Sequence, residues 1–147
     1  MNARRLLLLA ATPLAIASLA APAAAAVINV VKTASCGCCG KWVEHMKKAG
    51  HDVRVTNVED VTPTARRLGV PDDLRSCHTS SVGGYAIEGH VPAADIARLL
   101  REKPKAAGLS VPGMVAGSPG MEMGSNKPPY QTIIFTRDGK RKVFAQH

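Results

Sequence analysis

The sequence predicts an α/β fold that begins with a parallel pair of strands. Residues 27–33 form a nearly continuous apolar run, which is typical of a strand buried on both faces of a sheet. A helical pattern follows this run and ends at Gly50. Residues 52–58 then alternate between apolar and polar side chains, as a second strand does. Two strands joined through a helix are expected to lie in parallel with a right-handed crossover.

Further elements complete a β-α-β-α-β-β-α order. Thr62-Pro63 is a typical helix start, and Gly69 stops that short helix. A loop is predicted over residues 71–81. The elements predicted after the loop are two short strands, or one bent strand, and a last helix, over residues 82–85, 86–90 and 92–103.

The C-terminal part of the chain differs in composition from the rest. Residues 104–129 are rich in Gly, Pro and Ser and carry three methionines, so we predict a Met-rich loop there. The pattern of residues 130–147 predicts a β-hairpin that turns at Asp138-Gly139. We expect this hairpin to extend or cover one side of the core.

Residues 1–26 have the pattern of a secretory signal peptide. Arg4 and Arg5 form a short basic region, an apolar stretch follows, and Ala24-Ala25-Ala26 suits cleavage. We therefore expect an exported mature chain, residues 27–147, that forms a single domain. No later stretch is apolar for long enough to insert into a membrane.

The mature chain is basic, since removal of Arg4 and Arg5 lowers the net charge from +8 to +6. The excess cations are scattered in short groups, and no aromatic residues alternate with them to stack on bases. A solvated basic surface explains this pattern better than nucleic-acid binding, so no nucleic-acid partner is expected.

The chemistry of the sequence is concentrated in the stretch Ser35-Cys36-Gly37-Cys38-Cys39-Gly40. A strand before it and a helix after it place the sulfurs at a helix N-terminus, where free N–H groups and the helix dipole favour thiolates. Thiolates bind soft metals and attack disulfides, and both chemistries stay open at this point. Inert packing and a structural disulfide to the fourth cysteine, Cys77, are weaker alternatives, because clustered cysteines do not join separate elements.

The order of elements and the Cys-x-x-Cys spacing of Cys36 and Cys39 resemble the thioredoxin-like fold. In that fold the loop before the third strand faces the cysteine turn and usually carries a cis-proline. Here that loop reads Cys77-His78-Thr79, and the loop with His90 should reach the same pole. We therefore expect the four cysteines and two histidines to converge. The remaining histidines are interpreted as surface residues: His45, His51 and His147.

Met114, Met121 and Met123 lie in the predicted loop, which has no stripe of side chains that faces a core. Thioether ligation is therefore favoured over the usual role of methionine as a core residue. Thiolate, thioether and imidazole together suit copper, especially Cu(I). Zinc is satisfied by Cys and His alone, and calcium and magnesium need oxygen clusters that this sequence does not show.

Four motifs in the same order resemble the CopG-type periplasmic copper-resistance proteins, long described as a domain of unknown function. The motifs are Cys36-Gly37-Cys38-Cys39, Ser76-Cys77-His78-Thr79, Gly89-His90-Val91-Pro92 and the stretch from Val111-Pro112-Gly113-Met114 to Gly117-Ser118-Pro119-Gly120-Met121-Glu122. The resemblance covers essentially the whole mature chain. It implies a thioredoxin-like fold, a periplasmic location and a role in copper tolerance that includes conversion between Cu(I) and Cu(II). Other periplasmic copper-handling proteins are then the expected partners.

The resemblance also implies the metal ligands. Copper would be bound by the sulfurs of Cys36, Cys38, Cys39 and Cys77, and the adjacent Cys38-Cys39 pair suggests more than one ion. Further candidate ligands, with no choice among them, are His78, His90, Met114, Met121 and Met123.

Two functions stay open on the sequence alone. If copper is cycled, Cys36 and Cys39 would be the catalytic dithiol of a copper and thiol oxidoreductase. The alternative is a periplasmic thiol–disulfide oxidoreductase that acts on exported proteins. Cys38 disfavours it, because a third thiol inside the motif invites scrambled pairing, and so does the missing proline. A purely structural disulfide domain explains still less.

Overall fold

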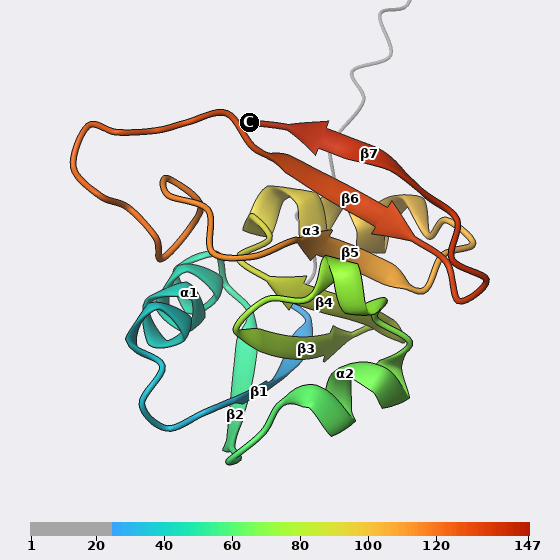
Figure 1. Ribbon diagram of the computed structural model, residues 1–147, viewed down its shortest axis with the longest axis horizontal. Coiled ribbons are helices and arrows are strands. Elements are labelled where there is room, and N and C mark those ends of the chain that lie inside the picture. Colours follow the sequence, from blue (N-terminus) through green and yellow to red (C-terminus); the bar gives the residue numbers. More distant parts are fainter. Residues whose placement is uncertain (1–24) are drawn as a thin grey trace, which may run out of the picture.

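The structure, a computed structural model, describes residues 25–147 and contains one seven-stranded sheet with three α-helices (Figure 1). The helices are α1 (Gly37–Lys48), α2 (Thr62–Leu68) and α3 (Ala93–Glu102), and a short 3-10 helix covers Asp72–Leu74. The strands are β1 (Val27–Lys32), β2 (Asp52–Asn57), β3 (His78–Val82), β4 (Tyr85–Gly89), β5 (Gly108–Val111), β6 (Gln131–Phe135) and β7 (Arg141–Gln146). The predicted α/β class and the β-α-β-α-β-β-α order up to α3 are confirmed. The predicted signal peptide falls, except for its last two residues, outside the described residues.

The topology of the sheet brings several strand ends to one edge. The strand order is β2-β1-β3-β4-β5-β6-β7, with β1 parallel to β2 and β4 parallel to β5. β3 is antiparallel to both β1 and β4, so His78 at its start lies opposite Lys32 at the end of β1. Gly89 and Val111 likewise pair at the ends of β4 and β5. The segments that leave or enter these strands therefore meet at the same end of the sheet.

Helices cover both faces of the sheet, and each face has its own apolar cluster. Ala86 and Ile87 are neighbours in β4 and must point to opposite faces. Ile87 belongs to the larger cluster with Trp42 of α1 and Ile96 of α3. Ala86 belongs to the smaller cluster with Ala65 of α2. α1 and α3 thus share one face, and α2 covers the other.

The predicted loop over residues 71–81 ends too late and the strand predicted at 82–85 is wrong in position, whereas the strand predicted at 86–90 is present one residue earlier, as β4. β3 starts at His78, four residues earlier than predicted, and Gly83-Gly84 form the turn to β4. The reason is that β3 reads His-Thr-Ser-Ser-Val and is mainly buried. A polar strand with both faces covered shows neither an apolar run nor an alternating pattern.

β5 (Gly108–Val111) lies inside the segment that was predicted to be loop, so that prediction is also wrong over these residues. The strand is four residues long and fully buried between β4 and β6. A Cβ atom added to Gly108 would lie 2.0 Å from the carbonyl oxygen of Ala86. Glycine at this position lets β4 and β5 pair closely. In the sequence, however, a glycine is more typical of a loop.

The C-terminal hairpin is present and extends the sheet at the edge far from β2 (Figure 1). His147 ends the chain with Nε2 3.0 Å from Oδ2 of the buried Asp95, which ties the hairpin to α3. His147 is exposed, as predicted, although its ring contacts Asp95. Among residues 25–147, no helix has the length and apolar character needed to cross a membrane.

We expect Gly108→Ala to destabilise the protein, because its methyl group cannot fit beside the Ala86 carbonyl without separating β4 from β5. The loss in the free energy of unfolding should be about 2–3 kcal/mol, as for other overpacked sites. Gly40→Ala is the matched control, since a Cβ there meets nothing within 4 Å and alanine favours the helix. Urea unfolding measures both variants, and equal stabilities would contradict the expectation.

Candidate metal centre

The first turn of α1 places three sulfurs at the end of the sheet where β1 stops. Cys36 is the N-cap residue of α1, and its side chain makes no capping hydrogen bond. Cys38 and Cys39 follow in the first turn. Cys39 is fully buried, whereas Cys36 and Cys38 are half-buried. The three sulfurs thus lie at a helix N-terminus, as the sequence predicted.

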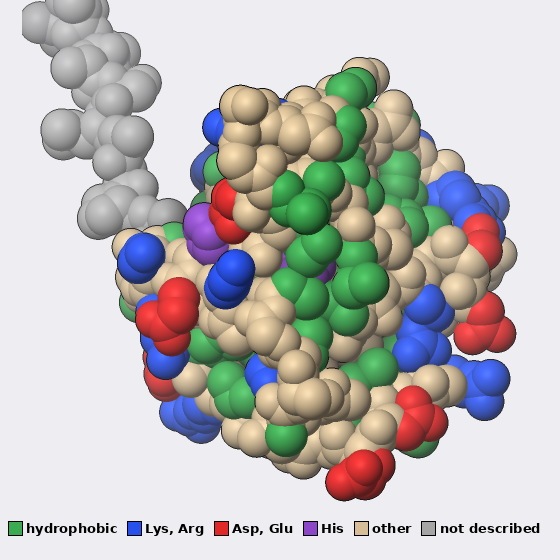
Figure 2. Space-filling model, turned by 60° about the vertical axis from the view of Figure 1, so that its left-hand side comes forward, with side chains coloured by type: hydrophobic (Ala, Val, Ile, Leu, Met, Phe, Trp, Pro, Cys, Tyr) green, Lys and Arg blue, Asp and Glu red, His purple; other side chains and the backbone are tan. Residues whose placement is uncertain are grey.

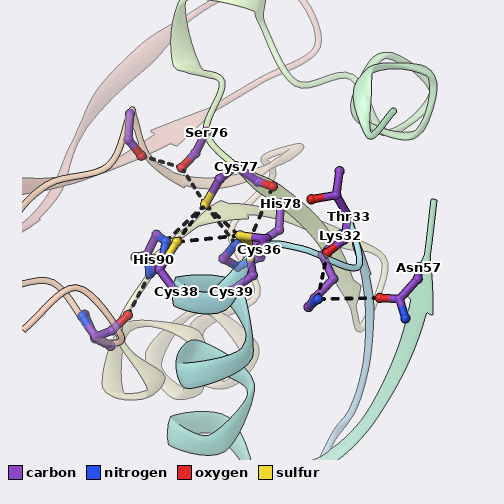
Figure 3. The surroundings of a disulfide bond; sticks show 12 residues. Lys32, Thr33, Cys36, Cys38, Cys39, Asn57, Ser76, Cys77, His78 and His90 are labelled. Atoms are coloured by element: carbon purple, nitrogen blue, oxygen red, sulfur yellow. Dashed lines mark hydrogen bonds between the residues drawn. A yellow bond between two sulfur atoms is a disulfide. The ribbon is translucent and has the colours of Figure 1, made fainter. Parts of the chain in front are cut away.

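Cys36 and Cys39 form a disulfide across the turn, with their Cα atoms 5.4 Å apart (Figure 3). Cys38 and Cys77 are free thiols. Cys38 Sγ lies 3.6 Å from Cys36 Sγ, so the free thiol is next to the disulfide. The disulfide joins the two cysteines of the Cys-x-x-Cys spacing and does not involve Cys77, which was the weaker alternative.

Cys77 approaches this turn from the loop that enters β3. Its Sγ lies 3.5 Å from Cys39 Sγ and 3.9 Å from Cys38 Sγ. The four cysteine sulfurs all lie within 4.8 Å of one another. Convergence of the four cysteines, expected from the sequence, is therefore observed in the folded chain.

His90 completes a second group of donors from the end of β4. Its Nε2 lies 3.1 Å from Cys77 Sγ, and its Nδ1 lies 2.8 Å from the carbonyl oxygen of Pro119. A carbonyl only accepts, so Nδ1 carries the proton and Nε2 presents a lone pair toward Cys77. This tautomer is the one that a metal ligand requires.

His78 is fully buried behind the sulfurs. Its Nδ1 lies 3.5 Å from Cys77 Sγ, and its ring packs on Trp42 with centroids 4.6 Å apart. Its Nε2 is buried and has no hydrogen-bond partner within the described residues. Cys77, His78 and His90 thus form a second convergent donor group that shares Cys77 with the first.

Burial keeps these donors neutral in the absence of metal. It raises the pKa of the Cys77 thiol to about 11, and the nearby Cys38 adds to the rise. Burial also lowers the pKa of His78 to about 3 and the pKa of His90 below its ordinary value. A hydrogen bond from Ser76 lowers the pKa of Cys77, but burial outweighs it. A cation that binds here must therefore displace the thiol proton, whereas the imidazoles are already deprotonated.

The C-terminal loop lies over the cysteine turn. A Cβ added to Gly120 would lie 2.8 Å from the Cys38 carbonyl oxygen, so the loop backbone touches α1. Glu122 Oε1 is 2.7 Å from His45 Nε2 at the surface. Figure 2 turns this side of the molecule forward and shows one histidine beside an acidic side chain and another, mostly covered, beside hydrophobic side chains. The loop thereby closes one side of the donor cluster.

The three loop methionines do not lie in equivalent places. Met121 follows Gly120 directly and is half-buried. Met114 and Met123 are mainly exposed, at 61% and 64%. Their role as ligands stays a prediction, and Met121 is the one whose neighbours contact the cysteine turn.

The comparisons with known proteins agree with the sequence motifs. The family described as "Protein of unknown function, DUF411" matches residues 74–121. A solved structure of the copper resistance protein CopG, Form 2, is 43% identical, covers 84% of this chain and 99% of its own, and has a TM-score of 0.80. The chain belongs to the CopG family of copper resistance proteins. CopG Form 1 gives 45% identity, 82% and 96% coverage and a TM-score of 0.78, and no curated protein matched.

Two buried charged residues near the CopG-type cysteine cluster were not predicted from the sequence, and Ser76 was named only as part of a motif. Lys32 is buried at the end of β1, donates from Nζ to the Thr33 carbonyl at 2.7 Å and lies opposite His78 in the sheet (Figure 3). Glu88 is buried in β4, and Ser76 precedes Cys77. A charged residue within an otherwise apolar strand was the available signal for both Lys32 and Glu88.

Acid should destabilise the metal-free protein between pH 6.5 and about 3. His78 has an ordinary pKa of 6.5 and a folded-state pKa of about 3, so in this range the unfolded chain binds a proton that the folded chain does not. The contribution of His78 to the free energy of unfolding is fully present above pH 6.5. It is lost as the pH falls, by up to about 1.4 kcal/mol per pH unit. Urea unfolding at several pH values measures this slope. His78→Gln should have a shallower slope, and an unchanged slope would contradict the assignment.

Proposed function

We propose that this CopG family member binds Cu(I) through the thiolates of Cys36, Cys38, Cys39 and Cys77 and acts in copper resistance. The observation that carries the proposal is the convergence of four sulfurs within 4.8 Å. The relatives at 43% and 45% identity are copper resistance proteins, which supports copper as the cargo.

The donor set fits a soft monovalent ion. The two convergent groups contain only sulfur and imidazole nitrogen, with no carboxylate in either. Such donors select Cu(I) over hard cations. Because Cys77 is a neutral thiol without metal, binding releases its proton and affinity should fall as the pH drops.

The Cys36–Cys39 pair gives the site two states with different numbers of thiol ligands. In the disulfide state only Cys38 and Cys77 remain as thiols. We propose that the reduced pair donates two electrons and two protons as its S–S bond forms. Two Cu(II) ions each accept one electron and become Cu(I), so the step balances. Cys36 and Cys39 would then be the redox-active residues of a copper oxidoreductase.

The proposed site offers further donors and could hold more than one ion. Cys38 Sγ is 3.6 Å from Cys36 Sγ and 3.9 Å from Cys77 Sγ, so its thiolate would be the candidate to be shared if two ions bind. His90 Nε2 and Met121 are the neutral donors that we favour, because both lie in segments that touch the cluster. Met114 and Met123 would bind only after the exposed loop folds inward, and His78 would bind through either ring nitrogen.

We further propose that residues 1–26 direct export and that the mature protein works in the periplasm. The basic start, apolar stretch and small residues before Val27 support this location. Other periplasmic copper-handling proteins would then deliver the ion or remove it.

A thiol–disulfide oxidoreductase is the second candidate function. The disulfide between Cys36 and Cys39, at the N-terminus of α1, favours it. The half-buried Cys38 next to this disulfide argues against it, because an internal thiol competes for the same sulfurs. Reduction of insulin by the protein would identify this activity.

Copper loading tests the proposal directly. Residues 27–147 are reduced, loaded with Cu(I) without oxygen in the presence of a competing chelator, and analysed for copper per chain. We expect retention of at least one equivalent, with strong loss in Cys38→Ser and Cys77→Ser, because each removes a thiolate from the cluster. Ser35→Ala, at an exposed position in the same turn, should behave as the wild type.

Cys38→Ser also separates the two candidate functions. It leaves Cys36 and Cys39 able to form their disulfide. A variant that loses copper but keeps a reversible disulfide supports the metal site. Failure of the wild type to hold Cu(I) against a weak chelator would overturn the copper proposal and favour the thiol–disulfide reaction.

A further inference from the structure

Glu88 is a buried carboxylate that lies beside the metal centre without contributing a donor to it. It occupies the central strand β4 and is fully buried. Its Oε2 accepts a hydrogen bond from Thr79 Oγ1 at 2.6 Å, and its Oε1 accepts one from the Ser76 N–H at 2.7 Å. Arg75 Nε, 3.4 Å from Oε1, supplies the opposite charge. We call the carboxylate with its bonds to Ser76 and Thr79 the Glu88 bridge.

The Glu88 bridge reaches the residues on both sides of the Cys77-His78 pair. Thr79 follows His78 and is the first residue of β3 that pairs with β4, opposite Glu88 itself. Ser76 precedes Cys77 and lies beyond the end of that ladder. Without the carboxylate, the β3–β4 ladder would hold Thr79 and leave the Ser76 N–H without its partner.

The same strand end also packs directly on Ser76. Gly89 follows Glu88, has a φ of +69°, and leaves only 2.5 Å between an added Cβ and Ser76 Oγ. Ser76 Oγ in turn donates to the Gly113 carbonyl in the turn after β5. Ser76 is therefore held between β4 and the C-terminal loop, and the position of Cys77 follows from that of Ser76.

The sulfur geometry leaves little room for movement of this segment. Cys77 Sγ is 3.5 Å from Cys39 Sγ and 3.1 Å from His90 Nε2. Cys77 is the only residue shared by the two convergent donor groups of the described chain. A displacement of about 1 Å at Cys77 would therefore disturb both groups at once.

We propose that Glu88 is a positioning residue of the metal centre, which fixes Cys77 and His78 by hydrogen bonds to the residues on either side of them. The inference rests on the proposed copper function for its consequence, but the positioning itself can be tested without copper. Outer residues that orient ligands typically change metal affinity by tenfold or more when removed.

Thr79 provides the sharpest variant, because it makes one arm of the Glu88 bridge. Thr79→Val removes the hydroxyl with little change in shape, and Thr79→Ser restores it. Thr132→Val is the matched control: Thr132 is also fully buried and donates at 2.6 Å to a buried carboxylate oxygen of Asp95, far from the cysteines in sequence. Glu88→Met removes both arms, while Glu88→Gln keeps an acceptor for Ser76 and a donor that Thr79 can accept.

The first measurement uses the copper-free protein. Hydrogen exchange of the Ser76 amide should be slow in the wild type and Glu88→Gln, and at least about tenfold faster in Glu88→Met. Alkylation of Cys77, followed by mass spectrometry, should be several-fold faster in Thr79→Val than in Thr79→Ser or Thr132→Val. Equal rates of Cys77 alkylation in Thr79→Val and Thr132→Val would overturn the proposal. This comparison can be made even if Glu88→Met does not fold.

The second measurement is Cu(I) competition on the reduced proteins. Thr79→Val should bind Cu(I) about tenfold more weakly than the wild type, with Thr79→Ser and Thr132→Val close to the wild type. Equal losses in Thr79→Val and Thr132→Val would show a general stability effect and overturn the role of Glu88. If the wild type holds no Cu(I), the proposed function fails, and the alkylation series alone decides whether Glu88 positions Cys77.

Discussion

The indole of Trp42 fixes the distances on which the metal centre depends. It is fully buried in the first helix after the cysteines, and its Nε1 donates to the Val91 carbonyl at 2.9 Å. The same side chain packs on the ring of His78, and its backbone lies against Gly120. One residue thus joins the cysteine turn, the start of β3, the segment after His90 and the C-terminal loop. Burial of so large a ring, with its only polar atom satisfied, makes these four segments a single rigid unit.

The metal centre combines close donors with an environment that leaves Cys77 and both histidines uncharged. Four sulfurs and two imidazoles lie together, yet burial raises the pKa of Cys77 and lowers the pKa of His78 and His90. The neutral Cys77 thiol, two neutral imidazoles and a disulfide can be packed in one place at little electrostatic cost, whereas four thiolates could not. Charge enters only with the metal, which replaces protons on sulfur. The donors can therefore be held in position before the metal binds, without negative charge on their sulfurs.

Local patterns in the sequence predicted those parts of the fold that local chemistry determines. The apolar first strand, the cysteine turn and the C-terminal hairpin each carry a short-range pattern, and each is present. The polar strand β3 and the four-residue β5 carry none, because their strand character comes from neighbours on both sides. The convergence of Cys77 and His90 on the turn was expected from the resemblance to the thioredoxin-like fold. The contacts of Glu88 were not, since nothing local links a carboxylate in β4 to an N–H group twelve residues earlier.

The donor segments lie far apart in the sequence. Their separation determines at which stage of folding the complete centre can form. Cys39 meets Cys77 across 38 residues, and His90 meets Pro119 across 29 residues. Contacts of this range form late in folding, because the chain must first close long loops. The cysteines of the turn, in contrast, are neighbours even in an unfolded chain. A soft metal ion that arrives early would find three local sulfurs, and only a chain with a finished sheet adds the fourth sulfur and the imidazoles. Full coordination is therefore a property of the finished fold, and it distinguishes a mature molecule from one that is still folding.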